Sequence, residues 1–437
     1  MTLTAMERLV VDEIAARRDD LVALTSDLIG FDTSARCVDG VDAKARDEAD
    51  LQQYLAERLA RAGAATDVWE PPPGEVRGSR QVPPGLRFDG FPQLIARFAG
   101  TGGGRSLLLN GHVDVVSPAP LAAWTSGPYD PQVRDGLLYG RGACDMKGGV
   151  AAMVFAAEVL ARREVRLAGD LSVNTVTDEE STSGGAVATV AHGARADAVV
   201  VTEPTGLDVG IAFRGSMLPT ITIQGRTGHA TGIQPHWRDG GAVNAIEKAA
   251  IVLDAVGRLR DEWRGRPDHR HPLLPGGNVL ATTMTAGDWE VSYPASCRLS
   301  CHVTYLPGQA DVHGYGSFVE REVTDWVLAA ARSDPWLAEH PPTFAWGVDC
   351  PPAEVPADSG VVEAVRLAGT DLGRDPALFG ADFWSDAATF RRMTGAPAIV
   401  MGPGAVKAAH TVDEHVPVAD LVACAQMVAL TAMRFCR

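Results

Sequence analysis

Apolar positions along the first half of the chain predict alternating helices and strands. Apolar side chains recur every three or four residues over 3–29 and again over 47–62, as on one face of an α-helix. Short strand-type runs and one apolar helix follow, at 65–70, 93–98, 106–116, 149–162 (the helix) and 171–177. Strands that alternate with helices are typical of an α/β domain, so we expect an α/β layer that opens with two helical segments.

The connection at 71–92 departs from this pattern. It is rich in Pro and Gly and longer than the usual link between two strands. The composition predicts no regular structure here, and it fits either a flexible surface loop or a flap over a site.

A different order of elements begins near residue 214. A strand at 217–224, a helix at 241–260, strands at 278–285 and 298–306, and a helix at 312–332 give a β-α-β-β-α order, typical of a two-layer α+β domain. Near residue 350 the first pattern resumes, with a helix at 360–372, an apolar strand at 398–401 and a helix at 418–435. We therefore predict a catalytic α/β domain with a mixed sheet at 1–213 and 350–437, interrupted by an inserted domain at 214–349.

Composition and charge narrow the classes of partner. The 437 residues are 46% apolar and 22% charged, as in globular proteins, and 39 Lys and Arg against 55 Asp and Glu leave a net charge of −16. This balance disfavours binding to nucleic acid or to an anionic membrane surface. The seven cysteines lack CxxC spacing, and the charged residues 1–20 lack the apolar core of a signal peptide. We expect a soluble, cytoplasmic protein.

Candidate chemistry begins at the end of the strand around 107–112. His112 and Asp114 are two residues apart, so in an extended chain they project to the same side. A metal-bound histidine needs a partner for its second ring N–H, which a carboxylate two residues on can provide. The plainer alternative is a His and an Asp that are each satisfied by turn amides.

Five further acidic residues lie near strand or helix ends. Asp145 directly precedes the apolar helix, where it could also serve as an N-cap. In Asp178-Glu179-Glu180 one carboxylate could ligate a metal while its neighbour takes a proton from water, although a solvated loop would equally explain three acids. Glu203 follows another apolar strand. The phosphate-binding patterns GxxxxGK[ST] and GxGxxG do not occur in the stretch before the helix.

One histidine completes this set. His410 follows the apolar strand at 398–401. Open α/β sheets present their ligands at strand ends, so the candidate metal ligands are expected at one edge; they are His112, Asp145, Glu180, Glu203 and His410. Two His and three carboxylates suit a pair of borderline divalent cations such as zinc.

The segments that carry these residues resemble the signature of the M20 metallopeptidase/deacylase family. They are Gly111-His-Val-Asp114, Tyr139-Gly-Arg-Gly142 with Asp145-Met-Lys-Gly148, Asp178-Glu-Glu180, Glu203-Pro-Thr205, and His410-Thr411 with Glu414. They occur in family order from about residue 107 to the C-terminus.

The resemblance implies a role for each of these residues. Asp145 would bridge two metal ions, with His112 and Glu203 on one ion and Glu180 and His410 on the other. Glu179 would be the general base that activates the bridging water, and Asp114 would orient His112. The Asp145–Met146 peptide bond would be cis. His229, in the inserted lid or dimerisation domain, would reach the partner subunit's site in a homodimer and stabilise the oxyanion.

The implied activity is hydrolysis of a linear amide by an enzyme that binds two divalent ions, zinc with cobalt or manganese as alternatives. Glu203 resembles the deacylases of the family, whereas several peptidases have Asp, so we expect deacylation of a small N-acyl amino acid or related N-acyl amine. The alternative is a dipeptidase or carboxypeptidase that uses the same site. Because every inferred ligand and Glu179 are present, a non-catalytic binding module is disfavoured. Thr304 stands where the family's lid commonly has an Arg, and an Asn usual before Pro294 is absent, so the resemblance does not define the substrate.

Overall fold

The computed structural model describes residues 3–437, which divide into two compact units. Unit 1 comprises the chain up to Ala212 together with Ala353–Ala381 and Ser385–Arg437. Unit 2 comprises Phe213–Pro352 and Asp382–Trp384. The boundaries expected from the sequence lie at 213/214 and 349/350.

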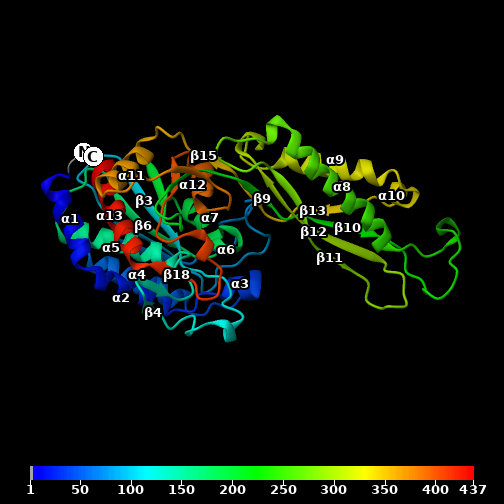
Figure 1. Cartoon of the computed structure of the whole chain (residues 1–437), viewed down its shortest axis with the longest axis horizontal. Coiled ribbons are helices and arrows are strands. Elements are labelled where there is room, and N and C mark those ends of the chain that lie inside the picture. The colour runs from blue at the N-terminus through cyan, green and yellow to red at the C-terminus, as the bar shows by residue number, and fades with distance from the viewer. Residues whose placement is uncertain (1–2) are drawn as a thin grey trace. The chain divides into compact units, whose positions relative to one another are not determined.

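A nine-stranded mixed sheet forms the centre of unit 1, which confirms the predicted α/β class (Figure 1). Its strands, in sheet order, are β1 (Ala65–Trp69), β2 (Gln93–Phe98), β6 (Leu171–Val176), β3 (Leu107–His112), β7 (Ala198–Val201), β17 (Ala398–Val400), β8 (Val209–Phe213) and β15 (Ala353–Glu354), with β16 (Leu378–Ala381) paired to β8. The central strands β6, β3, β7 and β17 run parallel, whereas β2 and β8 pair antiparallel with their neighbours in this group.

The central strands are apolar because both faces of the sheet are covered. Every residue of β3, β7 and β17 is buried, as expected where helices pack on either side of a parallel sheet. Two groups of helices contact it: α5 packs on β3 and β6, while α7 and α12 pack on β6, β7 and β17. The helices of unit 1 are α1 (Ala5–Ala16), α2 (Arg18–Ile29), α3 (Ala35–Asp39), α4 (Glu48–Arg61), α5 (Lys147–Arg162), α6 (Glu179–Thr182), α7 (Gly184–Ala191), α11 (Gly360–Asp371), α12 (Asp386–Thr394) and α13 (Val418–Phe435).

Helix α13 is a core helix of this unit. By length and composition it could span a membrane, the single such helix within residues 3–437, but 67% of it is buried inside the protein. It packs against α1, α5 and α11, so its apolar residues are accounted for by the core.

The connection at 71–92 contains no helix or strand, yet it is packed onto unit 1. Its apolar side chains form a small cluster with residues of α3 and α7; the buried members are Ala35, Val76, Val82, Leu86, Phe88, Phe91, Val187 and Ala188. The loop is therefore held by its own hydrophobic contacts rather than by backbone ladders.

Unit 2 is a six-stranded antiparallel sheet covered on one face by α8 and α9 (Figure 1). Its elements are β9 (Gly215–Met217), β10 (Thr220–Gln224), α8 (Ala245–Gly265), β11 (Asn278–Ala286), β12 (Ser296–Tyr305), α9 (Ser317–Ala331), α10 (Pro335–Glu339), β13 (Thr343–Ala345) and β14 (Asp349–Cys350). Alternate residues of β12, among them Leu299 and Val303, point into a core that also contains Trp263. The strand expected at 217–224 is two strands, β9 and β10, separated at Leu218-Pro219.

Candidate metal centre and catalytic residues

Three adjacent parallel strands end at one edge of the main sheet, and each delivers a candidate residue there. His112 is the last residue of β3, Glu179 and Glu180 follow β6, and Glu203 follows β7. Because β6, β3 and β7 are neighbours and parallel, their carboxyl ends meet at the same edge. This topology alone gathers side chains that are up to 91 residues apart in the chain (203 − 112).

A small antiparallel sheet brings the other two candidates together. It consists of β18 (His415–Pro417), β5 (Leu137–Tyr139) and β4 (Gln132–Arg134). Pairing of β18 with β5 places the segment that ends in Asp145 beside the one that begins at His410. Glu414 locks the two segments: its Oε1 accepts hydrogen bonds from the backbone N–H groups of Cys144 and Asp145, each 2.9 Å long.

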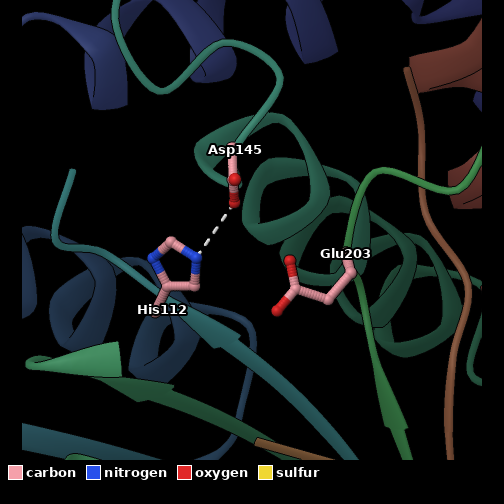
Figure 2. A group of neighbouring side chains, drawn as sticks. All are labelled: His112, Asp145 and Glu203. Carbon is pink, nitrogen blue, oxygen red and sulfur yellow. Dashed lines mark hydrogen bonds and ion pairs between the residues drawn. The ribbon is translucent and has the colours of Figure 1, made fainter. Parts of the chain in front are cut away.

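Asp145 lies between two groups of possible metal ligands. One group is His112, Asp145 and Glu203, and the other is Asp145, Glu180 and His410; the ligand atoms within each group lie within 4.8 Å of one another. Figure 2 shows the first group, with the Asp145 carboxylate pointing at the His112 ring and Glu203 opposite. One oxygen of Asp145 is 3.1 Å from His112 Nε2, and the other is 3.4 Å from His410 Nε2. The geometry therefore allows one carboxylate to serve both groups.

The ring of His112 is oriented by a backbone carbonyl. Its Nδ1 is 2.8 Å from the carbonyl oxygen of Asp114, whereas the nearer carboxylate oxygen of Asp114 is 3.7 Å away. A proton on Nδ1 would leave Nε2 free to act as a ligand. The Asp114 carboxylate instead accepts hydrogen bonds from the backbone N–H groups of Glu179, at 3.3 Å, and Glu180, at 3.1 Å. Asp114 thus contacts both the candidate ligand His112 and the acidic turn.

The carboxyl groups of this site hold protons more tightly than usual. Burial raises the pKa of Glu179 well above its ordinary value, and the charges of Glu203, Asp386 and Glu180 add to this effect against that of His112. Burial also raises the pKa values of Glu203 and Glu180, each aided by the Asp145 charge. Crowded buried carboxylates repel one another in their charged forms. Added positive charge would therefore stabilise the charged forms of these acids.

The pKa of Asp145 shifts in the opposite direction, whereas the pKa values of its two histidine partners are raised. Burial raises the pKa of Asp145, but the hydrogen bonds with His112 and His410 outweigh it and hold that pKa well below its ordinary value. Hydrogen bonds to Asp145 and Glu180 raise the pKa of His410 to about 10. The two histidine rings thus lie on either side of the Asp145 carboxylate, with their Nε2 atoms toward it.

These observations fit a pair of divalent cations. The donors are imidazole nitrogens and carboxylate oxygens with no thiolate among them, a set that suits zinc, cobalt or manganese. Glu179, outside both groups, is 3.9 Å from His112 Nε2 and has a buried Oε1 with no hydrogen-bond partner. Cations at the site would offset the repulsion among the acids. A water molecule held there could donate a hydrogen bond to Glu179 Oε1.

Two further residues singled out in the sequence lie in unit 2, and one further expectation concerns a peptide bond. His229 is exposed, and its Nδ1 accepts a hydrogen bond of 3.2 Å from the backbone N–H of Thr231. Thr304 is buried on β12, and its hydroxyl accepts a hydrogen bond of 3.3 Å from Arg214 Nη1. The Asp145–Met146 peptide bond is cis, which confirms that expectation.

Three buried polar residues around the site had no role assigned from the sequence. Glu414 was noted only as part of a motif, although a buried glutamate must find donors, and it binds Arg141 and the Asp145 segment. Asp386, at the start of α12, is fully buried beside the acids of the site. Arg36 is paired with Asp178. Position directly after a strand, which indicated the other candidates, could not indicate these three residues. Arg36 and Asp386 lie in helices, and Glu414 lies in the loop before β18.

A family profile matches most of the chain. Residues 108–434 match the description Peptidase family M20/M25/M40, a span that includes all five candidate ligands and Glu179.

Curated relatives match over nearly their whole length. The chain is 26% identical over 436 residues to the N-formyl-4-amino-5-aminomethyl-2-methylpyrimidine deformylase of Halalkalibacterium halodurans, covering 94% of each chain. It is 32% identical over 417 residues to the succinyl-diaminopimelate desuccinylase of Xanthomonas oryzae pv. oryzae, covering 93% of this chain and 96% of that one.

Solved structures share the fold at lower identity. A tripeptidase from Staphylococcus aureus superposes with a TM-score of 0.72 at 20% identity, covering 96% of this chain and 99% of that one. Human carnosine dipeptidase 1 gives a TM-score of 0.71 at 15% identity, with 98% and 99% covered. These two likenesses concern the fold alone.

Proposed function

The chain belongs to the M20/M25/M40 peptidase family and is a hydrolase of that family, and on this premise we propose that it removes the acyl group from a small N-acyl amine or N-acyl amino acid. The observation that carries the proposal is the arrangement around Asp145. Its carboxylate is shared by two groups of possible ligands, and beside them lies the buried Glu179, whose Oε1 makes no hydrogen bond within residues 3–437. That arrangement supplies ligands and a proton acceptor within one site.

The proposed metal ligands are His112, Asp145 and Glu203 for one ion and Asp145, Glu180 and His410 for the other. Zinc is the expected metal, and cobalt or manganese would suit the same donors. When bound, such ions polarise an amide carbonyl and lower the pKa of water toward about 7.

Glu179 is the proposed general base. Its carboxylate would accept a proton from water and return it to the departing amine nitrogen. Asp114 would keep Glu179 in place through the backbone N–H bonds described above, while its carbonyl orients His112.

A substrate panel tests the reaction class. We expect the protein loaded with zinc, cobalt or manganese to release amine from N-formyl, N-acetyl or N-succinyl compounds faster than it cleaves dipeptides, measured as kcat/KM by amine detection. The deformylase and desuccinylase relatives support N-acyl compounds of this size, and Glu203 supports the deacylase branch.

The panel also separates the alternative. Preferential cleavage of dipeptides or C-terminal residues would identify a dipeptidase or carboxypeptidase that uses the same centre. A protein that binds two ions per chain yet cleaves no amide in the panel would contradict the proposed function as a whole.

Unit 2 is proposed to act as a lid and to form a homodimer. Its strand β11 pairs with β12 alone among the described strands, which leaves a nine-residue edge. Leu280 and Met284 on this strand are 41% and 42% exposed. An exposed edge strand with apolar side chains is a ready surface for pairing with a second copy.

His229 is the proposed oxyanion donor across this dimer. Since its Nδ1 accepts the Thr231 N–H, the neutral ring carries its proton on Nε2, which can donate. We expect His229→Ala to lower kcat by about 10²-fold to 10³-fold, as for loss of one oxyanion donor. Mixing this variant with Glu179→Gln should restore part of the activity, because a hybrid dimer contains one complete site.

Complementation is measured as activity after subunit exchange, which differently tagged chains can demonstrate. Exchange without recovered activity would contradict the cross-subunit role of His229. A monomer by light scattering would contradict the homodimer itself.

A cytoplasmic location is also proposed. All seven cysteines are free, and six of them are buried as thiols. Such cysteine usage suits a reducing compartment.

A further inference from the structure

A buried arginine faces the acidic turn of the catalytic site. Asp178 directly precedes Glu179 and Glu180, is fully buried, and has a left-handed backbone conformation with φ of 69°. One oxygen of its carboxylate accepts the Thr182 hydroxyl, and the other is 3.1 Å from Arg36 Nε. Among residues 3–437, Arg36 is the one cationic side chain within ion-pair distance of Asp178.

Arg36 is itself fixed from three directions. It is 2% exposed, and in addition to the ion pair with Asp178 it donates hydrogen bonds to the carbonyl oxygens of Val41, at 2.8 Å, and Arg87, at 2.7 Å. Its guanidinium also lies 4.1 Å from the centre of the Phe91 ring. Arg87 and Phe91 belong to the 71–92 loop, so this loop and α3 together hold the guanidinium. A planar donor fork held in this way has little freedom to move.

The acidic turn is thus held from two sides. Asp114, at the end of the strand, accepts the backbone N–H groups of Glu179 and Glu180. On the other side, Arg36 forms an ion pair with the side chain of Asp178, the residue just before them. Asp178 is also tightly enclosed, because a Cβ added at Gly184 would lie 2.5 Å from its Oδ2. A shift of the Asp178 carboxylate would therefore move the backbone that carries the general base and a metal ligand.

From these contacts we propose that Arg36 is a positioning residue of the hydrolase: through Asp178 it sets the place of Glu179 and Glu180 and so supports metal binding and turnover. The proposal rests on the function proposed above for those two residues. The 71–92 loop would contribute to this positioning, because its Arg87 carbonyl and Phe91 ring hold Arg36.

Arg36→Met should weaken the binding of zinc by about 10-fold to 100-fold, as expected for loss of a partner behind a ligand. It should lower kcat with little change in KM. Zinc affinity is measured by competition with a chromophoric chelator on the folded apo protein, which needs no substrate. Failure of the proposed reaction would leave this readout intact, so the two hypotheses are tested separately.

A double variant tests whether the ion pair is the cause. Arg36→Met leaves the buried Asp178 carboxylate without its cationic partner, whereas Arg36→Met with Asp178→Asn removes both charges. Removing both members of a buried pair costs less than removing one. We therefore expect the double variant to bind zinc more tightly than Arg36→Met alone.

The matched control is Arg434→Met. Arg434 is partly buried and pairs with two carboxylates, those of Glu7 and Asp371, but it lies at the opposite end of α13 from His415. This variant should lower the Tm and leave zinc affinity unchanged. Equal zinc affinity in Arg36→Met and wild type, an equal loss in Arg434→Met, or a double variant no better than the single one would overturn the proposal. If Arg36→Met does not fold, Arg36→Lys, which keeps the charge but loses the fork, decides by the same titration.

Discussion

Glu179→Gln should nearly abolish turnover while leaving the metal centre and the fold in place. Glutamine has the shape of glutamate, but its amide cannot act as a base near neutral pH. We therefore expect kcat to fall by at least about 10²-fold to 10⁴-fold, the range for loss of a general base. Glu179 lies outside both ligand groups, so the amide should keep the metal content of the wild type. The measurements are steady-state kinetics on the best substrate of the panel and metal analysis of the same preparation.

The matched comparison is Glu180→Gln, its neighbour in the chain. Glu180 belongs to the second ligand group, so this change should lower metal content as well as kcat. Normal turnover in Glu179→Gln, or metal loss equal to that in Glu180→Gln, would show that Glu179 is not the proton acceptor.

Asp145→Asn should have a larger effect, because Asp145 is the member common to both ligand groups. An asparagine has no negative charge for two cations to share. The change also removes the carboxylate that pairs with His112 and His410. We expect metal content to fall from two ions per chain to below one, and kcat/KM to fall by more than about 10⁴-fold, beyond the loss of the general base alone. Metal analysis and kinetics after incubation with excess zinc check both.

Asp386→Asn provides the control for this result. It removes a negative charge from the same buried region, but Asp386 is in neither ligand group. It should keep both ions. Wild-type protein stripped with a chelator should match the Asp145 variant in activity and recover when zinc is returned, whereas the variant should not. Two ions retained by Asp145→Asn would exclude Asp145 as the shared ligand.

The sequence predicted elements best where one pattern ran without interruption. Helix α13 begins and ends where the spacing indicated, and the buried strands β3 and β6 lie within the predicted runs. The break at Arg17 between α1 and α2 was missed because helical spacing continues across it. Helix α5 begins at Lys147, two residues earlier than expected, because Gly148 and Gly149 continue the helix rather than interrupt it. A Cβ added at Gly149 would lie 2.1 Å from the Thr202 carbonyl, so glycine allows α5 to approach the end of β7.

The candidate site was predictable as a set of residues rather than as a geometry. The strand ends pointed to His112 and Glu203, since position after a buried strand is a local signal. The contacts of Glu414 and Arg36 could not be predicted, because they depend on the pairing of β5 with β18 and on the packing of the 71–92 loop. Likewise, nothing local indicates that the Asp114 carboxylate binds the amides of Glu179 and Glu180.

The insertion of β17 between β7 and β8 has a consequence for synthesis on the ribosome. Unit 2 is almost continuous and can emerge complete, whereas the main sheet waits for residues 398–400 to join two strands made about two hundred residues earlier. The last proposed ligand, His410, and the Glu414 carboxylate that holds the Asp145 segment emerge later still. A nascent chain released before these residues would have an open sheet edge and an unfinished metal centre. With the proposed ligand set, uptake of the second metal ion therefore requires the chain to have emerged at least through residue 414.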